Sequence, residues 1–177
     1  GFVAFNGSDV QIKHFADGRW QIQGVMLPAP EEGPLRIPPK IQALLQDTSI
    51  YLHDIQLDWV DEQRNNQHLV IKDVNIALLN DAPRHQLTVD LDLPQTYGGH
   101  VQLLADISGA IDQPDQWQGR MYMALEQIQL KSWFNDYWQL FDFTANGQLD
   151  ANVWIDWQQL QVNTAHAFVS GKNLKLH

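Results

Sequence analysis

The sequence predicts an all-β protein with two short helices, in which a long antiparallel, twisted sheet is curled into an apolar groove. Apolar and polar residues alternate along most of the 177 residues, as in HQLTVDLDLP (85–94), and this alternation is typical of strands with one face toward solvent. Helical spacing occurs in only two short segments. Several alternating segments shift parity once, as β-bulges would require, and bulges curve a sheet. A β-sandwich is the alternative fold.

The N-terminal part predicts a hairpin followed by an insertion. Alternation runs over 9–15 and 19–27, and Asp17-Gly18 between them is a strong hairpin-turn signal. Residues 28–47 are predicted to form a loop followed by a short helix, because prolines crowd the first part and apolar residues at helical spacing follow.

From residue 48 onward the predicted strands become longer. They cover 50–59, 69–78, 87–93, 101–107, 117–130, 149–157, 160–170 and 173 to the end, which brings the total to about ten. Parity shifts at His53-Asp54, Lys72-Asp73 and Glu126-Gln127 predict three bulges, the first two of them matching on successive strands.

The aromatic segment 131–141 has helical spacing and is predicted to be the second short helix. The chain ends in GKNLKLH, where a new alternating segment starts and stops. We therefore expect residues 1–177 to be a single β-rich segment of a larger protein.

Composition excludes several classes of function. Lys and Arg total 11 against 21 Asp and Glu, and the resulting net charge of −10 would repel nucleic-acid phosphates. No apolar run reaches the roughly 18 residues of a membrane-spanning helix. The absence of cysteine excludes disulfides, thiol nucleophiles and cysteine-bound zinc.

The chemistry of an active site is not indicated. A glycosidase could be suggested by the acidic residues Asp58, Asp61, Glu62, Asp90 and Asp92, since two nearby carboxylates can act as acid and as nucleophile or base. Asp90 and Asp92, however, alternate with apolar residues, as on a solvated strand face. The seven histidines form no metal-binding spacing, and no nucleophile or phosphate-binding motif is present. We expect neither catalytic residues, nor a metal, nor a cofactor. Trp154 has the parity of the polar side and is the tryptophan most expected to make a surface contact.

Four segments in a fixed order resemble the AsmA-like superfamily, most closely the large YhdP-type members of Gram-negative envelopes. They are IYLHDIQLDWVDE (50–62), LVIKDVNIALLNDAPRHQLTVDLDLP (69–94), GGHVQLLADISG (98–109) and WQGRMYMALEQIQLKSW (117–133). The resemblance implies an inner-membrane-anchored periplasmic protein that moves phospholipid between the inner and outer membranes through a hydrophobic groove and so supports the outer-membrane permeability barrier. It implies no catalytic residues. The expected partners are phospholipid acyl chains and other segments of the same chain, with membrane contact only through parts outside this sequence.

The candidate site is the apolar face of the predicted sheet. A strand of ~10 residues at ~3.3 Å per residue presents a strip about 30 Å long, which two short helices cannot cover. The expected lipid-binding residues are Ile50, Leu52, Leu57, Trp59, Ile71, Ile76, Leu78, Leu87, Val89, Leu91, Leu93, Val101, Leu103, Ile107, Met121, Met123, Leu125, Val153 and Ile155. Two alternatives stay open: a structural β-sandwich spacer, and a carbohydrate-binding module, which would need exposed tryptophans in a row.

Overall fold

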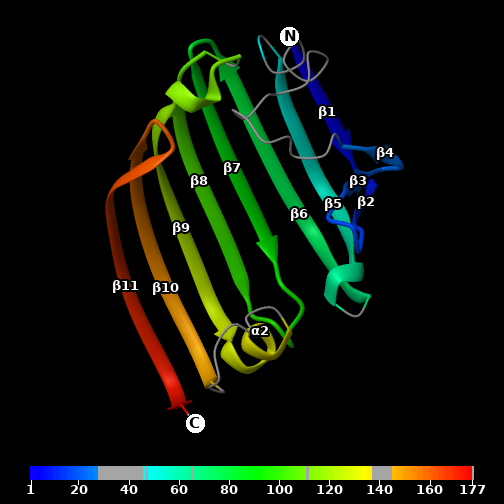
Figure 1. The fold of residues 1–177 in the computed structure, drawn as a ribbon, viewed down its shortest axis with the longest axis vertical. Coiled ribbons are helices and arrows are strands. Elements are labelled where there is room, and N and C mark those ends of the chain that lie inside the picture. Colours follow the sequence, from blue (N-terminus) through cyan, green and yellow to red (C-terminus); the bar gives the residue numbers. More distant parts are fainter. Residues whose placement is uncertain (28–45, 47, 65, 111, 137–144, 177) are drawn as a thin grey trace.

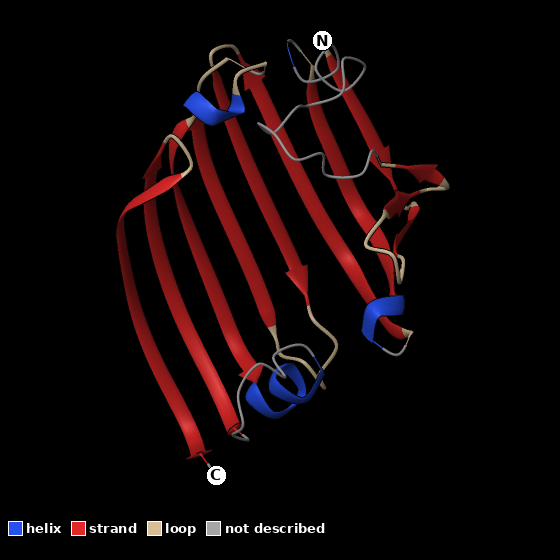
Figure 2. Ribbon diagram, viewed as in Figure 1, coloured by secondary structure: helices blue, strands red, loops and turns tan. Residues whose placement is uncertain are grey.

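The structure is a computed structural model that describes residues 1–27, 46, 48–64, 66–110, 112–136 and 145–176. Within this part, eleven strands form one open sheet, accompanied by a short helix, α2 (Leu130–Asp136), and two 3₁₀ turns, η1 (Glu62–Arg64) and η2 (Pro114–Gln116) (Figures 1 and 2). The strands are β1 (Phe2–Asn6), β2 (Asp9–His14), β3 (Trp20–Ile22), β4 (Val25–Met26), β5 (Ser49–Asp61), β6 (Gln67–Asp81), β7 (Arg84–Asp92), β8 (His100–Ser108), β9 (Gln118–Gln129), β10 (Ala145–Gln158) and β11 (Gln161–Leu176).

Strands β5 to β11 form a meander in which each strand is antiparallel to the one before it. Figure 1 shows these long strands side by side across the width of the molecule. The prediction of a long antiparallel sheet is confirmed. All eleven described strands belong to this one sheet, so they do not form the two packed sheets of a sandwich.

The edge of β5 that does not pair with β6 pairs in parallel with both β1 and β2, whereas the sequence predicted an antiparallel sheet. β1 pairs with the first part of β5 and β2 with the second, so the two short strands lie end to end. Between them the Gly7 N–H donates to His53 O (3.1 Å) and the Gln56 N–H donates to Ser8 O (3.0 Å). Strand β1 was not predicted, since FVAFN does not alternate.

Two further boundaries differ from the prediction for local reasons. The predicted strand over 19–27 is divided into β3 and β4, because Gln23 and Gly24 have positive φ values (49° and 79°) and turn the chain back. The two strands predicted at the C-terminus are one, β11, which continues through a register shift near Asn173 (φ 54°).

The two predicted helices are only partly covered by the described residues. The aromatic segment 131–141 is helical over α2, and the rest of it lies outside the described residues. The loop and helix predicted over 28–47 also lie outside them, apart from Gln46.

The three predicted bulges are confirmed. Asp54, Asp73 and Gln127 each have a left-handed backbone, with φ values of 56°, 55° and 53°, at register shifts of β5, β6 and β9. Neighbouring strands supply partners for two of the displaced backbone groups. The Asp54 N–H donates to Asn75 Oδ1 (3.1 Å), and the Gln127 N–H donates to Asp150 Oδ1 (2.7 Å).

The buried core lies at one end of β5 and β6. Ile55, Leu69, Ile71 and Val74 are 2 to 6% exposed and pack together. The other buried apolar residues of the described part are Ala105, Ile128 and Ala151, on β8, β9 and β10. Among the described residues, most of the sheet is therefore a single layer without a fully buried interior.

Candidate functional site

Strand registers align the predicted site residues in rows across one side of the sheet, which we call the apolar face. Paired residues stand on the same side of neighbouring strands. The first row consists of Ile50, Leu78, Leu87, Ala105, Met121 and Ile155, and the second of Leu52, Ile76, Val89, Leu103, Met123 and Val153. Each row crosses six strands, β5 to β10, without a polar side chain. Of these twelve residues only Ala105 is buried, and the other eleven are half-buried.

The remaining predicted site residues lie toward the two ends of the apolar face. Leu91, Val101 and Leu125 form a third row with Ala151. Leu57, Trp59 and Leu93 pack against the buried cluster to which Ile71 belongs. These four residues support the core at that end, and a share in ligand binding stays a prediction for them. Ile107 lies at the opposite end, paired with His85.

The core end of the apolar face is covered by the turn after β7 and by α2. The Trp133 Nε1–H donates to Tyr97 O (2.8 Å), and the two rings meet edge to face at 5.6 Å. Gly98 is buried beneath the turn, and a Cβ there would come within 3.0 Å of Ile128 and 3.1 Å of Leu93. A larger residue at this position would make these neighbouring side chains shift by a few tenths of an ångström.

The opposite end carries a polar pair, one buried histidine and one half-buried asparagine, that the sequence patterns did not reveal. His85 shares the parity of Leu87 and is 4% exposed. The Asn80 Nδ2 donates to Thr48 O (2.6 Å), so the Asn80 Oδ1 faces His85 Nδ1 at 2.7 Å and Nδ1 must carry a proton. No hydrogen-bond partner for His85 Nε2 is found in the described part of the structure.

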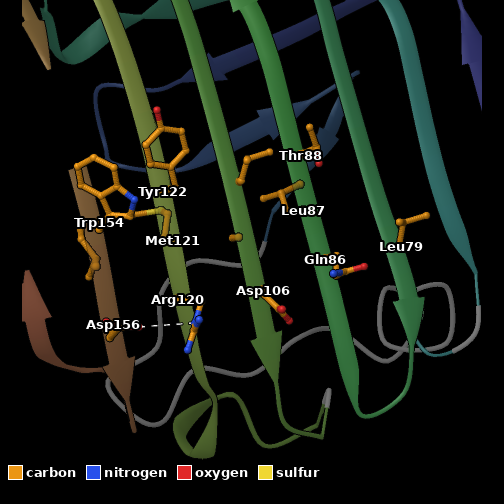
Figure 3. Close-up of a pocket in the computed structure, with 13 residues that line it drawn as sticks. Leu79, Gln86, Leu87, Thr88, Asp106, Arg120, Met121, Tyr122, Trp154 and Asp156 are labelled. Atoms are coloured by element: carbon orange, nitrogen blue, oxygen red, sulfur yellow. Dashed lines mark ion pairs between the residues drawn. The ribbon is translucent and has the colours of Figure 1, made fainter. Parts of the chain in front are cut away.

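The other side of the sheet, which we call the mixed face, contains a hollow of about 500 Å³ (Figure 3). One row beneath it consists of Thr88, Leu104, Tyr122 and Trp154. A parallel row, two residues further along each strand, consists of Gln86, Asp106, Arg120 and Asp156. Apolar and polar side chains therefore share this face, and Trp154 lies on the side that its parity predicts.

Ion pairs dominate the electrostatics of the mixed face. Arg84 donates to both carboxylate oxygens of Asp106 (2.8 and 2.5 Å), and this contact lowers the pKa of Asp106 and raises that of Arg84. His100 lies between Asp92 (3.0 Å) and Asp90 (3.2 Å). The hydrogen bond to Asp92 raises the pKa of His100, and the charge of Asp90 adds to the effect.

The acidic residues considered for catalysis each have a local partner. Asp58 pairs with His68 (2.5 Å), Asp61 with His14 (3.1 Å) and Glu62 with Lys13 (2.7 Å), while Asp90 and Asp92 flank His100. Among the described residues, no group of three His, Asp or Glu side chains could hold a metal ion. Each of these carboxylates thus has a side-chain partner within the fold.

Comparison with known protein families decides the identity of the chain. The family model described as YhdP protein matches residues 3–177. The chain belongs to the YhdP protein family. The family is not known for an enzymatic activity, and membership assigns this YhdP-family chain to the cell envelope. No curated protein and no solved structure matches the chain significantly. In the described part of this YhdP-family chain, none of the helices has the length and apolar character needed to cross a membrane.

Proposed function

We propose that this YhdP-family chain is part of a periplasmic protein, anchored to the inner membrane, that transfers phospholipid between the inner and outer membranes. The acyl chains would lie on the apolar face, which would serve as a hydrophobic groove. The observation that carries the proposal is the pair of apolar rows, each crossing six strands and left half-buried by the described residues.

The chemistry of these rows suits movement along the sheet more than tight binding at one point. Burial of apolar surface stabilises contact by about 0.8 kcal/mol per CH₂ group and has no preferred direction. An acyl chain can therefore shift from one position to the next at similar free energy. Met121 and Met123, paired with Ala105 and Leu103, add unbranched side chains that adapt to different chain positions.

The absence of polar side chains from the two rows also determines which part of a phospholipid they could bind. A phosphate or ammonium headgroup would lose its hydration there without gaining a partner. We therefore infer that headgroups stay outside the apolar face and that the rows select for hydrocarbon.

The test replaces one residue in the middle of the second row. Val89→Asp places a charge between Ile76 and Leu103, and Thr88→Asp places the same charge on the mixed face as a matched control. We expect the purified V89D protein to remain folded by circular dichroism and to lose co-purified phospholipid in native mass spectrometry, while T88D retains it.

Two other results would reject the proposal. Equal amounts of phospholipid in V89D and T88D would show that the apolar face is not the binding surface. Unfolding of V89D alone would mean that a charge is buried there without a partner, as expected for a purely structural spacer.

A further inference from the structure

The hollow on the mixed face is lined by an aromatic row that lies beside a polar row. Trp154 of β10 is 39% exposed, as is Leu104 of β8. Tyr122 of β9 lies 5.1 Å from the Trp154 ring, and Phe168 of β11 meets that ring edge to face at 5.8 Å from the other side. Exposed apolar groups gathered within a polar rim mark a binding surface more often than scattered ones do.

The aromatic residues are held in place before any ligand arrives. The Tyr122 hydroxyl donates to Asn152 Oδ1 (2.7 Å), which fixes its ring beside Trp154. Trp154 is then bounded by Tyr122 on one side and by Phe168 on the other. Binding to a side chain that is already ordered costs less conformational entropy.

The polar row lies about 7 Å from the aromatic row, because two residues of an extended strand span that distance. Its members are planar groups with several donors or acceptors: Gln86, Asp106, Arg120 and Asp156. Asp106 is oriented by Arg84, whereas Arg120 and Asp156 are 3.8 Å apart with side chains 80% and 53% exposed. So exposed a pair contributes little stability, and both groups can turn toward a ligand.

We propose that this hollow binds a pyranose unit of a glycan. A pyranose has an apolar C–H face, which fits against Trp154 and Leu104, and a rim of hydroxyls, which fits the donors and acceptors of the polar row. The volume of about 500 Å³ lies within the ~300–1,000 Å³ of small-ligand pockets. A lipid chain would make no use of the donors and acceptors of the polar row, and a polyanion would meet Asp106 and Asp156 on a chain of net charge −10.

The test is a titration of the ¹⁵N-labelled tryptophan side chains followed by NMR. The probes are chitohexaose, a β-linked N-acetylglucosamine hexamer, and maltohexaose, an α-linked glucose hexamer. We expect at least one of them to shift the Trp154 indole resonance, with the better probe indicating the linkage and substituents preferred. Asp156→Ala should weaken that binding about tenfold. Trp20→Ala removes a tryptophan of similar exposure (36%) on β3 and should leave it unchanged.

Three results would overturn the proposal: no shift of Trp154 up to about 5 mM of either probe, which is beyond weak binding; a shift that D156A leaves unaltered; or one that W20A abolishes. Trp154→Ala removes the reporting indole, so the expected loss of binding is measured by isothermal titration calorimetry, and D156A provides the independent evidence if W154A does not fold. The proposal does not depend on lipid transfer, because V89D alters the other face and should leave the Trp154 titration intact.

Discussion

At the scale of single residues, the polar groups of the apolar face are few and are fixed by short hydrogen bonds. Asn80 joins Thr48 O to His85 Nδ1 and so sets the orientation of a buried imidazole at the end of the two apolar rows. Removal of one member of such a series of hydrogen bonds leaves the other groups without partners. The resulting loss of stability is larger than the contribution of the hydrogen bond itself.

Asn80→Ala should therefore lower the free energy of unfolding by roughly 1–3 kcal/mol, because Thr48 O and His85 Nδ1 both lose a partner. Urea denaturation followed by circular dichroism measures this change. Asn163→Ala, at an exposed position of β11, is the control and should change stability by less than about 0.5 kcal/mol. Equal stability of the two variants would contradict the role assigned to Asn80.

His100 should titrate above the ordinary histidine pKa of about 6.5, because Asp92 accepts its hydrogen bond and Asp90 and Glu126 favour the charged ring. Its contribution to stability is complete below that ordinary pKa and is lost as the pH rises through the raised value. NMR titration of the imidazole measures the pKa directly. Asp92→Asn should lower it, whereas Asp115→Asn, on η2, should not; an unchanged pKa in D92N would refute this cause.

At the scale of elements, the bulges determine how each long strand is shaped. Asp54, Asp73 and Gln127 adopt a left-handed backbone that costs non-glycine residues about 1–2 kcal/mol. Side chains of Asn75 and Asp150 offset part of that cost by accepting the displaced N–H groups of β5 and β9. Bulges of this kind bend a strand and increase its twist.

Gln127→Gly and Gln127→Val should change stability in opposite directions. Glycine adopts the left-handed backbone without strain, so Q127G should be neutral or more stable by up to about 1 kcal/mol. A β-branched valine is poorly tolerated there, so Q127V should lose about 1–2 kcal/mol in urea denaturation. Gln118→Val, at an exposed and regular position of the same strand, should have little effect. A Q127V protein as stable as Q118V would argue against the bulge.

At the scale of the whole molecule, packing is unevenly distributed over the sheet. The buried cluster of Ile55, Leu69, Ile71 and Val74 stabilises β5 and β6. In the part of the chain that the structure describes, strand β11 has β10 as its one neighbour, and its residues from Gln161 to Lys175 are exposed. The free energy of local opening should follow this gradient.

Hydrogen exchange followed by mass spectrometry should therefore show the slowest exchange in peptides of β5 and β6 around the buried cluster and the fastest in β11. Bound phospholipid should slow exchange in β7 to β9, whose apolar rows it would cover. Uniform protection across all strands would contradict the gradient, and the lipid-free protein provides the baseline.

Much of this architecture could be predicted from sequence, because alternation and its parity shifts are local properties of a strand. The positions of the long strands and the bulges at Asp54, Asp73 and Gln127 follow from neighbouring residues alone. The parallel partners of β5 could not be predicted, since pairing between distant segments leaves no local pattern. Strand β1 could not be predicted either, because its residues do not alternate between apolar and polar.

The candidate site divides in the same way. The membership of the two apolar rows follows from parity, but their alignment depends on registers between strands that only the structure supplies. The hollow of the mixed face combines Tyr122, Trp154 and Phe168 from three strands. Of these three residues, only Trp154 could be predicted from its parity and size to make a surface contact. Its grouping with Tyr122 and Phe168 could not be predicted, because these aromatic residues are far away in the sequence.

The adjacent bulges of β5 and β6 also have a consequence for the fidelity of folding. In a single-layer sheet, sliding one strand by one residue would move its side chains to the opposite face, so that residues of the apolar rows would exchange places with residues of the mixed face. Asp54 and Asp73 oppose such sliding, since the Asp54 N–H finds Asn75 Oδ1 in one alignment only. The bulged residues thus fix the strand register, and the register determines which side chains lie on each face of the sheet.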